Sequence, residues 1–148
     1  MSKNRKDIDI EQLIKDGYEV TRDNCNKNQI IVFLKGPKES LYYNKKWKLL
    51  VEFNDNYPFR SPSIGFIDKI FHPNIDFLSG SICLDVLNHE WTPIYNLVTI
   101  FESLLPQLLL YPNPEDPLNI EASKLMKSDI KLYNETVKIN VDKFGLPV

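Results

Sequence analysis

The stretch Lys46-Trp-Lys-Leu-Leu-Val-Glu-Phe53 decides the fold, because its polarity alternates from one residue to the next. One face is wholly apolar and consists of Trp47, Leu49, Val51 and Phe53. Such alternation is typical of a β-strand with one face in a core and the other in water. A strand with one buried face is therefore expected over residues 46–53.

Three further segments around this strand also predict strands. Residues Tyr18–Arg22 and Gln29–Lys35 precede it, and Ser63–Ile67 follows the breaks at Pro58 and Pro62. The connections between the first three strands are short enough for antiparallel hairpins. The pattern indicates an antiparallel meander of four strands.

Along the sequence, helices are predicted both before and after the meander. A short amphipathic helix around residues 10–14 ends near Gly17, and a core-facing helix over 97–108 begins at the N-cap Asn96. Pro106 should kink that helix or weaken its last turn. After a proline-rich turn at 111–117, helices are expected at 121–127 and 130–144. The fold class is α+β with an antiparallel sheet, in one domain spanning residues 1–148.

Composition narrows the functional classes. The chain has 148 residues, 43% of them hydrophobic, and a net charge of -2, which argues against a dedicated nucleic-acid binder. Two cysteines, Cys25 and Cys83, exclude a disulfide scaffold and a zinc site of four thiolates. The most apolar window, residues 97–111, is too short and too interrupted to span a membrane. With no apolar leader, the chain is expected in the cytoplasm or nucleus, with both thiols free.

A long segment without periodicity, residues 71–94, contains Cys83. Long structured loops inside a small domain are often functional. Cys83 could be a buried structural cysteine or a nucleophile, with His72 or His89 as a candidate base, although no papain-like spacing is present. No Lys or Arg occurs from Ile70 through Ser123, so Asp76 and Asp85, if close in space, would raise the pKa of the thiol.

Several motifs resemble those of the ubiquitin-conjugating enzymes. They are Phe71-His-Pro-Asn-Ile75, Ser81-Ile-Cys83-Leu-Asp85, Glu90-Trp-Thr-Pro93 and Tyr111-Pro-Asn-Pro-Glu-Asp-Pro-Leu118. Upstream, Gly36-Pro37 and Tyr57-Pro-Phe-Arg-Ser-Pro62 also match, so the resemblance covers nearly the whole chain. Within the family the chain is most similar to the H type, through Ser61-Pro-Ser-Ile-Gly-Phe66 and Lys69-Ile-Phe-His72. The family fold is a four-stranded antiparallel meander, a long active-site loop and flanking helices, in agreement with the pattern above.

The resemblance implies roles for several residues of the long loop and of the turn that ends near Leu118. Cys83 would accept the C-terminal carboxyl of ubiquitin as a thioester and pass it to a lysine amine. Asn74 would steady the oxyanion or order the loop, Asp116 would orient the incoming lysine, and His72 and Pro73 would be structural. Leu84, Asp85 and Leu118 would line the groove. No metal or organic cofactor is implied, since the activating enzyme consumes the ATP.

The resemblance also implies partners. They are ubiquitin, its activating enzyme, a RING-type ligase and protein substrates, with no nucleic acid or membrane. The ligase surface would comprise Arg5, Lys6, Phe59, Trp91, Thr92 and Pro93. For Trp91, a place in the core competes evenly with a place at this interface. Two alternatives remain: conjugation of another ubiquitin-like modifier, and a non-catalytic ubiquitin-binding variant, against which the presence of both Cys83 and Asn74 argues.

Overall fold

The computed structural model describes residues 4–148, so the first three residues of the predicted domain lie outside the described part. Its sheet contains β1 (Val20–Arg22), β2 (Gln29–Lys35), β3 (Lys45–Glu52) and β4 (Ser63–Phe66). Each strand is antiparallel to the next in the order β1-β2-β3-β4. The apolar face predicted for residues 46–53 is buried, and Trp47, Leu49 and Val51 are fully covered. The α+β class and the meander are confirmed.

A fifth strand, β5 (Leu146–Pro147), was not predicted from the sequence; it pairs with Lys45 and Lys46 at the start of β3. It was expected only as the end of the last helix, because Gly145 and Pro147 are strong helix terminators. Two residues are too few to show a strand periodicity, so only their pairing across the fold identifies them.

The predicted helix over 97–108 is divided into three parts. It consists of α3 (Leu97–Thr99), a π-helical segment η1 (Ile100–Leu104) and α4 (Leu105–Leu110). Asn96 caps its start, as predicted, by accepting a hydrogen bond from the Thr99 N–H at 2.8 Å. The disturbance lies before Pro106 and not in the last turn. Since proline has no N–H to donate, it fits at the beginning of α4, directly after the wider π turn.

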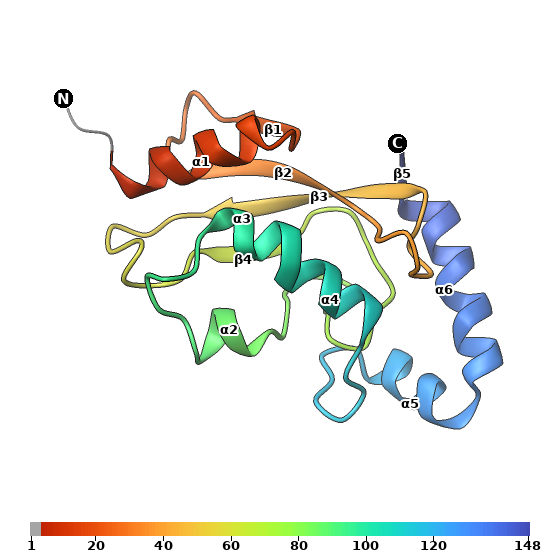
Figure 1. Ribbon diagram of the computed structural model, residues 1–148. Coiled ribbons are helices and arrows are strands. Elements are labelled where there is room, and N and C mark those ends of the chain that lie inside the picture. The colour runs from red at the N-terminus through yellow and green to blue at the C-terminus, as the bar shows by residue number, and fades with distance from the viewer. Residues whose placement is uncertain (1–3) are drawn as a thin grey trace.

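The remaining helices surround the sheet. At the N-terminus, α1 (Arg5–Lys15) is capped by Asn4, and at the C-terminus α5 (Ile120–Ser128) leads to α6 (Ile130–Phe144). A short helix, α2 (Asp85–Asn88), lies inside the segment that was predicted to have no regular structure. Figure 1 shows α3 and α4 running along the sheet, with α5 and α6 at the far end from α1. The core lies between the sheet and these helices.

The segment before Cys83 is attached to the sheet edge at β4. Gly80 has a φ of 77°, and a Cβ there would lie 1.9 Å from the Phe66 carbonyl oxygen, so this close approach requires glycine. The Phe66 N–H donates to the Gly80 carbonyl at 2.9 Å, and Ser81 bridges to Gly65. This attachment gives the chain a defined path into Cys83.

Candidate active site

His72 joins the long loop to α4 from inside the core. It is fully buried; its Nδ1 accepts a hydrogen bond from the Asn74 N–H at 3.0 Å, and its Nε2 lies 2.8 Å from the Leu108 carbonyl oxygen. These contacts define a neutral ring that accepts at Nδ1 and donates at Nε2. Burial lowers the pKa of His72 to about 4, so the ring is uncharged at neutral pH.

The two residues after His72 organise the chain around the cysteine. The Pro73 carbonyl accepts hydrogen bonds from the N–H groups of Leu118 and Asn119 at 2.9 and 3.0 Å. The Asn74 carbonyl accepts one from the Cys83 N–H at 2.8 Å. Three consecutive residues, 72–74, therefore connect α4, the cysteine and the chain that enters α5.

The side chain of Asn74 is buried and binds the backbone of the turn at residues 111–117. Its Nδ2 donates to the carbonyls of Asn113 at 2.8 Å and Asp116 at 3.0 Å, and its Oδ1 accepts from the Asn113 N–H at 2.8 Å. Both donor hydrogens of the amide thus have partners in the turn. Of the two family roles, this geometry favours ordering of the loop, because an oxyanion would have to displace an existing bond.

Cys83 is partly buried beside Asp116. Its Sγ lies 3.5 Å from Asp116 Oδ2 and opens into a cavity of about 180 Å³. The cavity is lined by Asn74, Cys83, Leu84, Asp85, Val86, Leu108, Asn113 and Asp116. The fold therefore brings a thiol and a carboxylate together from segments that are 33 residues apart.

The surroundings of the thiol favour its protonated form. Burial raises the pKa of Cys83 first, followed by the hydrogen bond and negative charge of Asp116 and the charge of Asp85. The expectation for Asp85 holds, whereas Asp76 is not among the groups that act on this thiol. Asp76 instead accepts hydrogen bonds from the N–H and hydroxyl of Ser79, at 2.8 and 2.7 Å.

Most of the predicted groove residues lie around this cavity. Leu84 and Asp85 line it, whereas Leu118, within the described residues 4–148, is absent from its lining and contributes its backbone N–H to Pro73. Asn113 was not singled out from the sequence, although both its backbone N–H and its backbone carbonyl are hydrogen-bonded to the side chain of Asn74. Its partner is 39 residues away, and an asparagine between two prolines carries no signal beyond that of a turn.

The predicted ligase surface lies on α1 and two loops. Phe59 is 77% exposed, and Thr92 and Pro93 are also exposed. Trp91 packs against the core, one of its two predicted places: its ring is partly buried there, and its Nε1 donates to the Pro58 carbonyl at 2.7 Å. Its place at the ligase interface stays a prediction. Arg5 is bound to the protein itself, through Asp9 and the carbonyls of Pro93 and Tyr95.

The partly exposed side chain of Lys6 reaches toward the β1–β2 connection. Its Nζ lies 3.3 Å from the Lys27 carbonyl oxygen and 3.4 Å from Asn28 Oδ1. Cys25, on the same connection, is an exposed free thiol.

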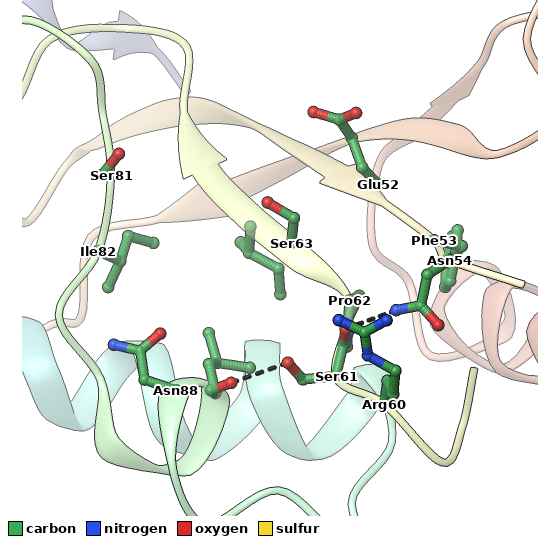
Figure 2. Close-up of a pocket in the computed structure, with 12 residues that line it drawn as sticks. Glu52, Phe53, Asn54, Arg60, Ser61, Pro62, Ser63, Ser81, Ile82 and Asn88 are labelled. Carbon is green, nitrogen blue, oxygen red and sulfur yellow. Dashed lines mark hydrogen bonds between the residues drawn. The ribbon is translucent and has the colours of Figure 1, made fainter. Parts of the chain in front are cut away.

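A second cavity, of about 510 Å³, is lined by residues 52–54 and 60–64, by Ser81 and Ile82, and by Leu87 and Asn88 of α2. Figure 2 shows its polar lining, which includes Glu52, Arg60 and Asn88, and the hydrogen bond of 2.8 Å from the Ser61 hydroxyl to the Leu87 carbonyl. Neither Cys83 nor Asn74 lines this cavity. A substrate that reacts with the Cys83 thiol would therefore bind at the smaller cavity, which Cys83 lines.

Residues 4–148 contain no group of three or more His, Cys, Asp or Glu side chains arranged to hold a metal ion. Within the same residues, no helix is long and apolar enough to cross a membrane.

Comparison with known proteins identifies the family. The profile described as ubiquitin-conjugating enzyme matches residues 2–141. The chain belongs to the ubiquitin-conjugating enzymes. It is 48% identical over 143 residues to ubiquitin-conjugating enzyme E2 5 of Arabidopsis thaliana, covering 97% of this chain and 77% of that protein. It is also 48% identical over 143 residues to the 23 kDa ubiquitin-conjugating enzyme of Triticum aestivum, covering 97% and 78%.

A solved structure supports the fold assignment of this ubiquitin-conjugating enzyme. The E2 domain of a Toxoplasma gondii ubiquitin conjugating enzyme superimposes with a TM-score of 0.87 at 29% identity, over 93% of this chain and 94% of that one. As a member of the family, the protein is a thioester-forming acyltransferase, and the family works with ubiquitin, an activating enzyme and ligases in general. The narrower resemblance to the H type stays a prediction.

Proposed function

We propose that Cys83 carries ubiquitin as a thioester and transfers it to lysine amines, with Asp116 and Asn74 organising the acceptor side. The single observation that carries this proposal is the 3.5 Å approach of Cys83 Sγ to Asp116 Oδ2 in an open cavity. An accessible thiol beside a carboxylate supports both parts of the proposal, attack by the sulfur and orientation of an incoming amine.

Loading is an exchange between two thiols. The Cys83 sulfur attacks the carbonyl carbon of the thioester between ubiquitin and the activating enzyme; a new C–S bond forms and the old one breaks. The Cys83 proton passes to the solvent, and the departing thiolate takes one up. Because a thioester replaces a thioester, the step needs little driving force.

The raised pKa of Cys83 has a consequence for the loaded state. A sulfur whose thiol has a high pKa is a poorer leaving group, so the thioester resists premature cleavage by water. The acidic side chains that disfavour the thiolate do not oppose the thioester, which carries no charge at sulfur. The same surroundings therefore suit storage of an activated acyl group.

In the transfer step, a lysine amine attacks the thioester carbonyl. The C–N bond forms, the C–S bond breaks, and Cys83 leaves as a thiolate that regains a proton while the amine loses one. Asp116 is placed to accept a hydrogen bond from the amine and orient it. Asn74 acts on this step through the turn that carries Asp116.

For the finer partners, we place a RING-type ligase on Phe59, Thr92 and Pro93, whose exposure supports contact. Trp91, Lys6 and Arg5 contribute to the shape of that surface. Cytoplasmic or nuclear action is part of the proposal, as are protein substrates with accessible lysines.

The test of loading mixes the protein with activating enzyme, ATP and ubiquitin and separates the products on a non-reducing gel. We expect a band shifted by one ubiquitin that disappears on treatment with a thiol reductant. Cys83→Ser should give a shifted band that survives the reductant, because an oxygen ester replaces the thioester.

Cys25→Ser serves as the matched control and should load as the wild type does. Failure of the folded protein to load with ubiquitin would refute the proposal, and loading with another modifier alone would favour the alternative conjugating activity. Loss of loading in folded Cys25→Ser would mean that the assignment of the thioester to Cys83 is wrong.

A further inference from the structure

Asp9 is a buried carboxylate on α1 with partners from two directions. It is 5% exposed and forms an ion pair with Arg5, whose Nε lies 2.9 Å from Oδ1 and 3.0 Å from Oδ2. Its Oδ2 also accepts a hydrogen bond from the Tyr57 hydroxyl. A buried charge persists only where pairing and hydrogen bonds compensate its lost hydration, so these contacts hold one another in place.

Arg5 links Asp9 to the loop that follows Trp91. With Nε held by Asp9, its Nη1 donates to the Pro93 carbonyl at 3.0 Å and its Nη2 to the Tyr95 carbonyl at 2.6 Å. The guanidinium is planar and rigid, so fixing one edge fixes the direction of the other donors. Asp9 thereby determines where Arg5 holds the backbone of residues 93–95.

Tyr57 links Asp9 to the loop that carries Phe59. Its ring packs edge-on against Phe53, with centroids 5.0 Å apart, and lies 6.1 Å from the ring of Trp91. Trp91 in turn donates to the Pro58 carbonyl at 2.7 Å. The two loops are therefore joined to each other as well as to α1.

The side chains that these loops present are strongly exposed and apolar. Phe59 is 77% exposed and Ile94 is 83% exposed. Two large apolar side chains held outward on neighbouring loops bind a protein partner more tightly when their relative positions are fixed before binding, because less conformational entropy is then lost.

We propose that Asp9 is a positioning residue for the ligase-facing surface: by fixing Arg5 and Tyr57, it holds Phe59 and Ile94 in one binding-competent arrangement. This inference rests on the proposed function, because it assumes a ligase at that surface. Asp9 itself is buried and touches neither the ligase nor the reacting atoms.

The test measures single-turnover discharge of loaded enzyme to free lysine at increasing concentrations of a purified RING domain. The RING domain used is the one, from a panel, that most accelerates wild-type discharge. In Asp9→Asn, we expect the RING concentration for half-maximal stimulation to rise ~10-fold, which corresponds to a competent arrangement populated about one tenth of the time. The maximal rate and the rate without RING domain should stay at the wild-type level.

Two further variants make the result specific. Tyr57→Phe keeps the ring and removes only the hydroxyl, so it should shift the half-maximal concentration in the same direction by a smaller factor. Asp7→Asn removes the same charge from α1 outside this network and should behave as the wild type. If Asp9→Asn does not fold, Tyr57→Phe decides alone.

Two outcomes would overturn the proposal. One is an unchanged half-maximal concentration in folded Asp9→Asn and Tyr57→Phe. The other is an equal loss of discharge with and without the RING domain, which indicates a general structural defect. Loading is scored first, so a wild type that never forms the thioester refutes the proposed function and not this inference.

Discussion

At the scale of single residues, the site depends on the pair Cys83 and Asp116. A nucleophilic cysteine usually has a base or cation nearby that lowers the pKa of its thiol. Here burial and two carboxylates raise the pKa of Cys83 instead. That arrangement suits an exchange of activated acyl groups and disfavours redox chemistry at the same sulfur.

Replacing Asp116 should separate its two effects. Asp116→Asn removes a negative charge beside Cys83, so the pKa of the thiol should fall and alkylation by iodoacetamide should reach its half-maximal rate at lower pH. Discharge of the loaded enzyme to free lysine should slow ~10²-fold, because the amine loses its orienting carboxylate.

Glu115→Gln is the matched control, since Glu115 is the neighbouring carboxylate and pairs with Lys127 at 3.3 Å. Its alkylation profile should follow the wild type. An Asp116→Asn profile that coincides with the wild type would contradict the role given to Asp116.

At the scale of elements, the turn at residues 111–117 is held from two sides. Asn74 binds it through three hydrogen bonds, and from α5 the Ser123 hydroxyl donates to the Pro114 carbonyl at 2.5 Å. The turn that carries the Asp116 carboxylate to Cys83 is therefore fixed by hydrogen bonds from two directions. The proline-rich sequence makes the turn stiff, but these contacts determine where it points.

Asn74→Ala should loosen that support without affecting loading. The Asn113 N–H loses its acceptor, so its hydrogen exchange should accelerate, and the free energy of unfolding should fall by about 1–3 kcal/mol. Discharge to lysine should slow while thioester formation persists. Unchanged exchange at Asn113 together with slow discharge would instead favour a direct oxyanion role for Asn74.

The lysine-free stretch from Ile70 through Ser123 predicts slow attack of the enzyme on its own thioester. The fold modifies this expectation, because Lys127 on α5 reaches Glu115, the neighbour of Asp116. We expect self-modification to be slower than discharge to free lysine and to map to Lys127 by mass spectrometry. Lys127→Arg should remove it and Lys131→Arg should not; fast modification that persists in Lys127→Arg would contradict the expectation.

At the scale of the whole molecule, local pattern predicted the meander and the longer helices, and the family resemblance indicated the motif residues. The features that local pattern could not predict depend on contacts between residues far apart in the sequence. The two residues of β5 and the four of α2 are too short for periodicity. Asp116, and not Asp76, influences the thiol, because the turn folds back onto Cys83. Arg5 was expected at a partner surface, and the sequence could not show its two carbonyl partners about 90 residues away.

The buried His72 makes the stability of the whole fold depend on pH. Its pKa is about 4 in the folded protein and about 6.5 when exposed, so between these values the unfolded chain binds more protons. Its contribution is complete above pH 6.5 and is lost as the pH falls toward 4, by roughly 3 kcal/mol in the free energy of unfolding.

Urea unfolding at a series of pH values measures this dependence. His72→Gln should flatten it between pH 6.5 and 4, whatever its absolute stability. The control is His89→Gln, which removes the other histidine of the chain from an exposed position outside the core. An identical slope in His72→Gln would mean that other groups cause the acid sensitivity.

The central claim, a ubiquitin thioester on Cys83, is tested most directly by thiol protection in the loaded enzyme. The purified thioester is treated with N-ethylmaleimide, digested and analysed by mass spectrometry, before and after release of ubiquitin. We expect Cys25 to be alkylated in both samples and Cys83 only after release. Alkylation of Cys83 in the intact thioester, with Cys25 protected, would contradict the account.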